Sequence, residues 1–362
     1  MKIVIIGFWT FPKKTPRAFR TWNLAEGFAE KGHEVVLYAY TGGKDYEKET
    51  NGLFKVKNLG DCRPWCADSI GDVKMPFYMR VIKKLVGEID LYPYNKCYPH
   101  IQAVLQQEGK IDLLISVAYP HVVHWAVAKY IDRKNVKKWV AECGDPFMGD
   151  PFNKHKVFLE KVERDWCSKA DYITIPVESG IPAYYPEYAD KIKIIPQGFK
   201  IDNVDTKEYK KNDIPTFGFA GIVYPNQRDP RKFLEYIYNE NIQVNFVVYS
   251  QSSVFQEFKK IMPERIDIRE LVDREVLIKE LSGVDFLINV KNLTGVQVPS
   301  KLIDYTLMGR PILDISTQFT KEEENNFLMF LKGDYSNKHE DIDIEQYSIK
   351  RVCDSFIELA NY

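Results

Sequence analysis

Residues 295–313, GVQVPSKLIDYTLMGRPIL, predict a polar turn, a short helix and a strand, and the other elements can be ordered around them. Pro299 suits the first helical turn, because its missing N–H would be unsatisfied there in any case. Gly309 can adopt the left-handed conformation that ends a helix, and a proline follows two residues later. The pattern therefore predicts a helix of about ten residues between Pro299 and Gly309.

The start of this helix has the features of a phosphate site. Free backbone N–H groups at a helix N-terminus attract an anion, and Ser300 and Lys301 lie beside them. Asp304 follows Ser300 by four residues, so it shares that face one turn deeper, where the ribose hydroxyls of a nucleotide need an acceptor. The spacing alone is equally consistent with a capped amphipathic helix whose Asp304 is solvated.

The string VPSKLIDYTLMGRPIL resembles the PSK-(L/I)-x-E-Y-x-x-x-G-(K/R)-P-(I/V) segment of retaining GT-B glycosyltransferases in glycosyltransferase family 4. Many members of this family make bacterial surface polysaccharides, and this segment binds the diphosphate and ribose of their sugar nucleotide. The resemblance implies nucleotide contacts at Val298, Ser300, Lys301 and Asp304. The full family motif has two glutamates eight positions apart. Here Val296 replaces the first and Asp304 the second, which argues against a direct acidic contact with the sugar.

The composition predicts a soluble globular protein of two domains. A chain of 362 residues exceeds one ordinary core, and 28% charged residues with a net charge of −1 argue against disorder and against nucleic acid as a partner. No run of about 18 apolar residues occurs, and Lys2–Gly7 predicts a β-strand rather than a signal peptide. Six cysteines without regular spacing predict reduced thiols in the cytoplasm and no metal site.

The N-terminal residues predict a βαβ unit with strand 2–7, helix 16–31 and strand 34–40. Its first turn has no Gly-x-Gly-x-x-Gly, which argues against an NAD-dependent dehydrogenase. The run TPRAFRTWNLAEGFAEKGHEVVL resembles the amino-terminal segment of the same glycosyltransferases, whose first loop faces the interdomain cleft. The basic residues here are candidates for binding an anionic acceptor, with a solvated basic loop as the alternative: Lys13, Lys14, Arg17 and Arg20.

Polar residues follow two further predicted strands. Strand 112–117 leads to His121, and strand 139–141 leads to Glu142 and Asp145. Ligands of open parallel sheets bind at the carboxyl ends of strands, so these side chains are candidates for a cleft. WVAECGDPF resembles the W-(I/V)-x-D-x-R-D-P-W stretch of this subfamily, with Cys-Gly at 143–144 where Phe-Arg is more usual. The resemblance implies that Asp145 is a cleft carboxylate.

A charged run at 200–211 predicts a linker to a second series of alternating strands and helices, whose first strand ends at Gly221. The next loop opens a helix, and its Arg228 and Lys232 resemble the basic residues that hold the diphosphate in the family. Ile222 stands where many relatives have an arginine. The last segment, 342–360, predicts a helix that packs back on the first domain in the family.

Residues 74–86 predict a basic amphipathic helix. Lys74, Arg80, Lys83 and Lys84 occur there without an acidic residue, among large apolar side chains. Such a helix can lie on an anionic membrane surface, and an ordinary surface helix is the alternative.

Together these observations predict an α/β protein of GT-B type, with two Rossmann-like parallel-sheet domains that face a cleft. Residues 1–204 are expected to hold the acceptor and 205–345 the nucleotide sugar, while the terminal helix 346–362 returns to the first domain. The resemblance implies transfer of a sugar, with retention, from a nucleoside diphosphate sugar to a glycan or polyprenyl-linked acceptor. The expected location is the cytoplasm or the inner face of the membrane.

The catalytic candidates are Arg228, Lys301, Asp145 and His121, and no metal or other cofactor is expected. The acid missing at Val296 and the basic residue missing at Ile222 leave open a catalytically silent GT-B subunit that binds a nucleotide or partner without turnover. A sugar-nucleotide epimerase of the same fold is a further alternative.

Overall fold

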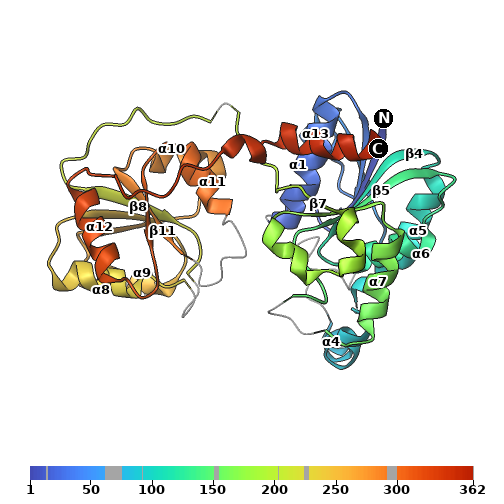
Figure 1. Ribbon diagram of the computed structural model, residues 1–362, viewed down its shortest axis with the longest axis horizontal. Helices are drawn as coiled ribbons and strands as arrows, with labels where there is room; N and C mark the ends of the chain where they lie inside the picture. The colour runs from blue at the N-terminus through green and yellow to red at the C-terminus, as the bar shows by residue number, and fades with distance from the viewer. Residues whose placement is uncertain are drawn as a thin grey trace. The chain divides into compact units, whose positions relative to one another are not determined.

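The computed structural model describes residues 1–13, 15–61, 76–91, 93–150, 155–202, 204–223, 228–291 and 300–361, with backbone only at 86–90 and 300. The chain forms two compact units (Figure 1). Unit 1 comprises Met1–Lys200 and Glu345–Tyr362, and unit 2 comprises Ile201–Ile344. The domain limits expected from the sequence, after residues 204 and 345, lie within a few residues of this division.

Unit 1 is built on a parallel sheet with the strand order β3-β2-β1-β4-β5-β6-β7. Its strands are β1 (Lys2–Ile6), β2 (Glu34–Ala39), β3 (Lys55–Asn58), β4 (Ile111–Ala118), β5 (Val136–Cys143), β6 (Tyr172–Ile175) and β7 (Ile192–Ile194). Its α-helices are α1 (Pro16–Glu30), α2 (Glu47–Thr50), α4 (Phe77–Asp90), α5 (Tyr98–Gln107), α6 (Val122–Tyr130), α7 (Leu159–Lys169) and α13 (Ile349–Asn361).

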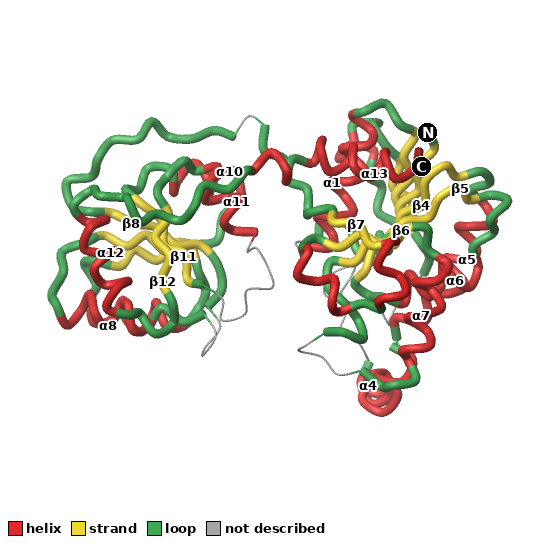
Figure 2. Tube along the Cα trace, in the orientation of Figure 1, coloured by secondary structure: helices red, strands yellow, loops and turns green. Residues whose placement is uncertain are grey.

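The central strand β1 is buried on both faces of this sheet. Val4 and Ile6 pack in the core that α5, α6 and α7 share, whereas Ile3 and Ile5 pack in the core shared with α1 and α13. Figure 2 shows helices flanking the strands of this unit. A parallel sheet covered on both faces needs apolar side chains at successive positions, which explains the uninterrupted Ile3–Ile6 run.

The C-terminal helix α13 packs against α1, as Figure 1 shows, so its expected return to the first domain is confirmed. A Cβ on Gly27 of α1 would lie 2.8 Å from the sulfur of Cys353, and this close approach explains the glycine. The helix begins at Ile349, later than the expected residue 342. The cause is a bridge in which the N–H of Phe199 donates to Tyr347 and the N–H of Ile349 donates to Phe199.

Unit 2 has a second parallel sheet with the strand order β10-β9-β8-β11-β12. Its strands are β8 (Thr216–Ala220), β9 (Asn245–Tyr249), β10 (Ile266–Arg269), β11 (Phe286–Val290) and β12 (Ile312–Ile315). Its α-helices are α8 (Arg231–Asn239), α9 (Ser253–Ile261), α10 (Arg274–Leu281), α11 (Ser300–Leu307) and α12 (Lys321–Leu331).

Phe217 on β8 lies at the centre of the unit 2 core. It pairs in register with Phe246 of β9 and Phe286 of β11, and its ring lies 4.5 and 5.2 Å from theirs. The predicted end of α11 is confirmed, because Gly309 has the left-handed φ of 65°. Both sheets therefore have the parallel, helix-covered organisation expected from the sequence. Within the described residues, no helix has the length and apolar character needed to cross a membrane.

Candidate functional site

The strand order of each sheet reverses beside its first strand, between β1 and β4 in unit 1 and between β8 and β11 in unit 2. Open parallel sheets bind ligands at such a point, beyond the carboxyl ends of the strands. His121 and Asp145 follow β4 and β5, Gly221 follows β8, and Lys301 lies on the helix after β11. His121, Gly221 and Lys301 thus follow strands beside these two reversal points, and Asp145 follows the next strand, β5.

Lys301 is a buried lysine in the first turn of α11. Its Nζ has no hydrogen-bond partner among the described residues and lies 5.1 Å from the centre of the Phe219 ring. Burial, and next the positive charge of Arg228, lower the pKa of Lys301 to about 6, against a smaller opposite effect of Asp314. Much of the amine is therefore uncharged at neutral pH, and an anion beside it would favour the charged form.

Arg228 follows β8 and lies close to Gly221. A Cβ on Gly221 would be 3.9 Å from Nη2 of Arg228, and Gly221 has a φ of +131°, which favours glycine. The charge of Arg228 lowers the pKa of Lys301, so the two basic groups lie within electrostatic range of each other. Two basic side chains brought together at the end of β8, beside the first turn of a helix, form an arrangement suited to a diphosphate, whose negative charge would favour the charged form of Lys301.

Asp304 lies one turn further along α11 and is held by Arg274, which donates from Nε at 2.7 Å. Burial raises the pKa of Asp304, and the charge and hydrogen bond of Arg274 act in the opposite direction. The remaining lone pairs of this partly buried carboxylate can still accept hydrogen bonds from ligand hydroxyls. Arg274 was not among the predicted residues, because it lies on α10 and no sequence spacing links it to Asp304.

Tyr305 fixes the orientation of α11 and was likewise not among the predicted site residues. Its buried hydroxyl accepts a hydrogen bond from the N–H of Ala220 at 2.8 Å, at the last residue of β8. This bond joins α11 to β8, so Lys301 and Gly221 are positioned relative to each other by secondary structure.

Of the other predicted nucleotide contacts, the structure describes the side chain of Lys232 but not those of Val298 and Ser300. Lys232, on α8, donates to Gln318 at 2.6 Å, so its amine is engaged with the segment after β12. Val298 lies outside the described residues, and Ser300 is described only as the first backbone position of α11.

His121 lies at the start of α6 in unit 1. Its Nε2 lies 3.1 Å from the carbonyl oxygen of Asp145, and burial lowers the pKa of the imidazole to about 4. The ring is therefore neutral near pH 7, and because a carbonyl only accepts, Nε2 carries the proton. Nδ1 is then a bare acceptor, and it has no hydrogen-bond partner among the described residues. This nitrogen is buried, so it is a possible acceptor only for a hydroxyl that reaches this enclosed position.

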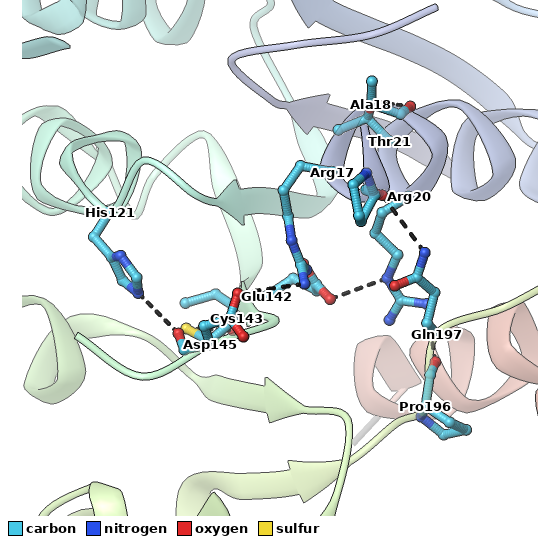
Figure 3. A network of polar contacts seen from close by, with 12 residues as sticks. Arg17, Ala18, Arg20, Thr21, His121, Glu142, Cys143, Asp145, Pro196 and Gln197 are labelled. Carbon is cyan, nitrogen blue, oxygen red and sulfur yellow. Dashed lines mark hydrogen bonds and ion pairs between the residues drawn. The ribbon is translucent and has the colours of Figure 1, made fainter. Parts of the chain in front are cut away.

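Glu142 and Asp145 lie at and just beyond the end of β5, and Arg17 contacts both (Figure 3). Nη1 of Arg17 lies 3.6 Å from Glu142 and Nη2 lies 3.8 Å from Asp145. Arg20 is buried, donates from Nε to Glu142 at 3.0 Å and from Nη1 to the carbonyl of Pro196 at 2.9 Å. Arg20 therefore ties α1 to β5, whereas the carboxylate of Asp145 is half-exposed and accessible to a ligand.

Two further basic residues of the first loop were predicted to bind an acceptor. Lys13 lies with its Nζ 4.6 Å from the centre of the Trp9 ring. Lys14 lies outside the described residues.

His124, whose ring lies 5.9 Å from that of His121, belongs to a second buried polar group that the sequence did not predict. Nδ1 of His124 lies 2.8 Å from the hydroxyl of Ser116, and its Nε2 lies 3.4 Å from the sulfur of Cys143. Burial lowers the pKa of His124 well below its usual value and raises the pKa of the Cys143 thiol well above its own. A neutral imidazole beside a protonated thiol does not form a nucleophilic pair. The contacts of His124 with Ser116 and Cys143 instead join α6 to β4 and β5. In the described part of the chain, no cluster of His, Cys, Asp and Glu has the arrangement of a metal site.

No family model and no curated protein matches this sequence. Solved structures do match over nearly the full length. A glycosyltransferase from Rickettsia africae has a TM-score of 0.62 at 11% identity, covering 99% of this chain and 98% of that one. HepE from Anabaena, solved with UDP-glucose, has a TM-score of 0.60 at 10% identity, covering 100% and 99%.

TarM from S. aureus, solved as a mutant in complex with fondaparinux, α-GlcNAc-glycerol and UDP, has a TM-score of 0.59 at 12% identity, covering 100% of both chains. At identities this low, the structural similarity establishes a common fold alone. The two parallel sheets, their strand orders and these similarities agree, and the chain therefore has the GT-B fold of glycosyltransferases.

Proposed function

We propose that this protein transfers a sugar from a nucleoside diphosphate sugar to a glycan or lipid-linked acceptor, with retention of the anomeric configuration, in the synthesis of a surface polysaccharide. In this reaction the bond between the anomeric carbon and the diphosphate oxygen breaks, and its electron pair leaves with the diphosphate. The acceptor hydroxyl forms the new bond to that carbon and gives its proton to the departing diphosphate or to water.

The observation that carries the proposal is the pairing of Lys301 with Arg228 at the end of β8. Lys301 is buried without a hydrogen-bond partner among the described residues, and Arg228 lies within electrostatic range of it. A diphosphate supplies the negative charge that this arrangement lacks, and it gains charge as the glycosidic bond breaks. Fixed cations aimed at a leaving group are the stabilisation that such a transition state needs, and we propose that they act here without a metal ion.

The donor contacts are completed by Asp304, which we assign to the ribose hydroxyls. The acceptor is assigned to unit 1, where the bare Nδ1 of His121, the carboxylate of Asp145 and the guanidinium of Arg17 surround the ends of β4 and β5. The structures of HepE with UDP-glucose and of TarM with UDP support a nucleotide sugar as the donor by analogy of fold.

Thermal unfolding of the full-length protein with UDP, GDP, ADP and CDP tests the donor site. A nucleotide at 100 times its dissociation constant should add about 2.7 kcal/mol of stability. Turnover is then measured as release of the nucleoside diphosphate from the matching sugar nucleotides with glycan and polyprenyl phosphate acceptors, and NMR of the product gives the anomeric configuration. If none of the four nucleotides raises the melting temperature, the donor assignment is wrong.

A catalytically silent GT-B subunit remains the second candidate. It is favoured by Ile222, which is exposed where related chains carry a basic residue, and by the engagement of Asp304 with Arg274. Nucleotide binding without release of the nucleoside diphosphate or formation of an epimer, over the whole acceptor panel, would support it.

The proposed location is the cytoplasm, because the four cysteines in the described part of the chain are free thiols, as in reducing compartments.

A further inference from the structure

The helix α4 exposes its apolar face. Five of its large apolar side chains are solvent-accessible, with exposed fractions of 73% for Phe77, 61% for Tyr78, 40% for Val81, 38% for Ile82 and 72% for Leu85. Their spacing of one, three and four residues places them on one side of the helix. An ordinary surface helix buries this side against its own domain. Among the large apolar side chains that the structure describes on α4, at residues 77–85, Met79 is the one buried in the domain, with 5% exposed.

The charges of α4 have one sign over the same stretch. Arg80, Lys83 and Lys84 are exposed, and no acidic residue occurs between Phe77 and Leu85. The acidic residues of α4, Glu88 and Asp90, occur only in its last part. A helix that presents large apolar side chains together with cations matches the boundary of an anionic bilayer, where apolar groups enter the acyl region and cations meet phosphates.

We propose that α4 docks unit 1 on an anionic lipid surface, with its apolar stripe of residues 77, 78, 81, 82 and 85 inserted at the boundary between headgroups and acyl chains. The partner is lipid rather than a second copy of this chain. Two copies meeting through α4 would bring two sets of three cations together, and their repulsion opposes such a contact. This docking uses neither Lys301 nor Arg228, so it stands independently of the proposed sugar transfer.

Flotation of the full-length protein with vesicles tests the proposal. One set of vesicles contains phosphatidylcholine alone, and the other contains about 30% phosphatidylglycerol, each at low and at high salt. The protein should float with the anionic vesicles only. It should float less at high salt, because dissolved ions already screen exposed charges more than roughly 10 Å apart at 0.1 M salt and act over shorter distances as the salt rises. Absence of binding to the anionic vesicles at low salt would overturn the proposal.

Two variants separate charge from insertion. Lys83→Glu/Lys84→Glu should lower the partition onto anionic vesicles by at least about tenfold, since each cation contributes on the order of fivefold. Phe77→Ser/Leu85→Ser should lower it comparably by removing apolar area. The matched control is Lys134→Glu/Lys137→Glu, which reverses two exposed lysines before and at the start of β5 and should bind less tightly only through the change in net charge.

These variants alter exposed side chains, so each should keep the melting temperature of the wild type. If Phe77→Ser/Leu85→Ser floats like the wild type, charge alone accounts for the binding and insertion of α4 is wrong. If the control loses as much binding as the Lys83/Lys84 variant, α4 is not the contact. A dimer in solution that Phe77→Ser/Leu85→Ser dissociates would show that a second copy covers this face, and would also overturn the proposal.

Discussion

The guanidinium of Arg17 occupies the space beside Gly144 that any side chain at that position would need. A Cβ on Gly144 would lie 1.7 Å from Nη2 of Arg17 and 1.8 Å from its Cζ. The W-(I/V)-x-D-x-R-D-P-W stretch that this segment resembles has its arginine at residue 144. This chain therefore also has a guanidinium next to residue 144, but it comes from the first turn of α1 and contacts Glu142 and Asp145.

We expect Gly144→Ala to displace the Arg17 guanidinium and thereby to weaken acceptor binding. Under the proposed function, the KM for the acceptor should rise by about tenfold while the KM for the donor stays within about twofold, because the two substrates are assigned to different units. Initial rates with each substrate varied in turn give both constants.

Arg17→Gln should produce the same defect, since both changes remove the same group from the same place. The double variant Gly144→Ala/Arg17→Gln should then be no worse than either single variant, which a double-mutant cycle measures. Additive losses would contradict the interpretation. Arg164→Gln is the matched control, because Arg164 forms exposed ion pairs with Glu160 and Glu187 elsewhere in unit 1 and should leave both KM values unchanged.

Asp304 and Arg228 should affect different kinetic constants. Ribose hydroxyls keep their charge during transfer, so Asp304→Asn should mainly raise the donor KM and leave kcat nearly unchanged. The leaving diphosphate gains charge, so Arg228→Ala should lower kcat by on the order of 10²-fold, more than it raises KM. Single-turnover rates must show first that chemistry limits kcat. An unchanged single-turnover rate in Arg228→Ala would move the diphosphate role to Lys301 or Lys232.

Arg274→Gln is the control for the Asp304 prediction, because Arg274 forms an ion pair with Asp304. If Asp304 binds ribose, Arg274→Gln should raise the donor KM less than Asp304→Asn does, because it leaves the carboxylate in place. If Asp304 serves only to hold α10 to α11, the two variants should lower the melting temperature alike and leave the donor KM unchanged.

Much of the fold could be predicted because it depends on local patterns. The Ile3–Ile6 run determines β1, because its side chains are buried on both faces of the sheet. The glycine at 309 determines the end of α11, because it adopts a left-handed φ. β3 was missed because Lys55–Asn58 lies at the edge of the sheet and has mostly exposed polar side chains, without an apolar period. The helix α12 was also not predicted, although its capping box of Thr320 and Glu323 is a readable signal.

The site was less predictable because its contacts are non-local. Arg17 reaches Glu142 across 125 positions of sequence (142 − 17), and Arg274 reaches Asp304 from another helix. Neither pair has a spacing that a sequence pattern can reveal. Spacing did suggest that Lys301 faces a phosphate, but only the fold shows that its amine is buried beside Phe219 and within range of Arg228.

Unit 2 should fold and bind a nucleoside diphosphate by itself. Its sheet is covered by two clusters of buried side chains that belong to residues of this unit, and the donor candidates Lys301, Arg228 and Asp304 all lie within it. A fragment of residues 201–344 should unfold cooperatively and bind the nucleotide with a Kd within about tenfold of the full-length value, measured by calorimetry. A folded fragment that shows no binding heat would contradict the assignment of the donor to this unit.

Nucleotide binding should take up protons at Lys301. The pKa of this amine is lowered to about 6 mainly by burial, so above pH 6 the free protein has a largely neutral group there. A bound diphosphate favours the charged form and raises this pKa. Affinity should therefore be constant below about pH 6 and fall as the pH rises further, by up to about tenfold per unit, until the raised pKa of the complex is reached.

Calorimetry in two buffers with different ionisation enthalpies at about pH 7.5 measures this uptake directly, and up to about one proton per bound nucleotide is expected from this group. Lys301→Arg is the control, because arginine stays charged at every pH of interest and should abolish the uptake while keeping a cation near the diphosphate. The nucleotide's own phosphate titrates equally in both proteins, so the difference between them isolates Lys301. Equal heats in the two buffers for the wild type, or equal uptake by wild type and Lys301→Arg, would show that the amine is already charged before the nucleotide binds.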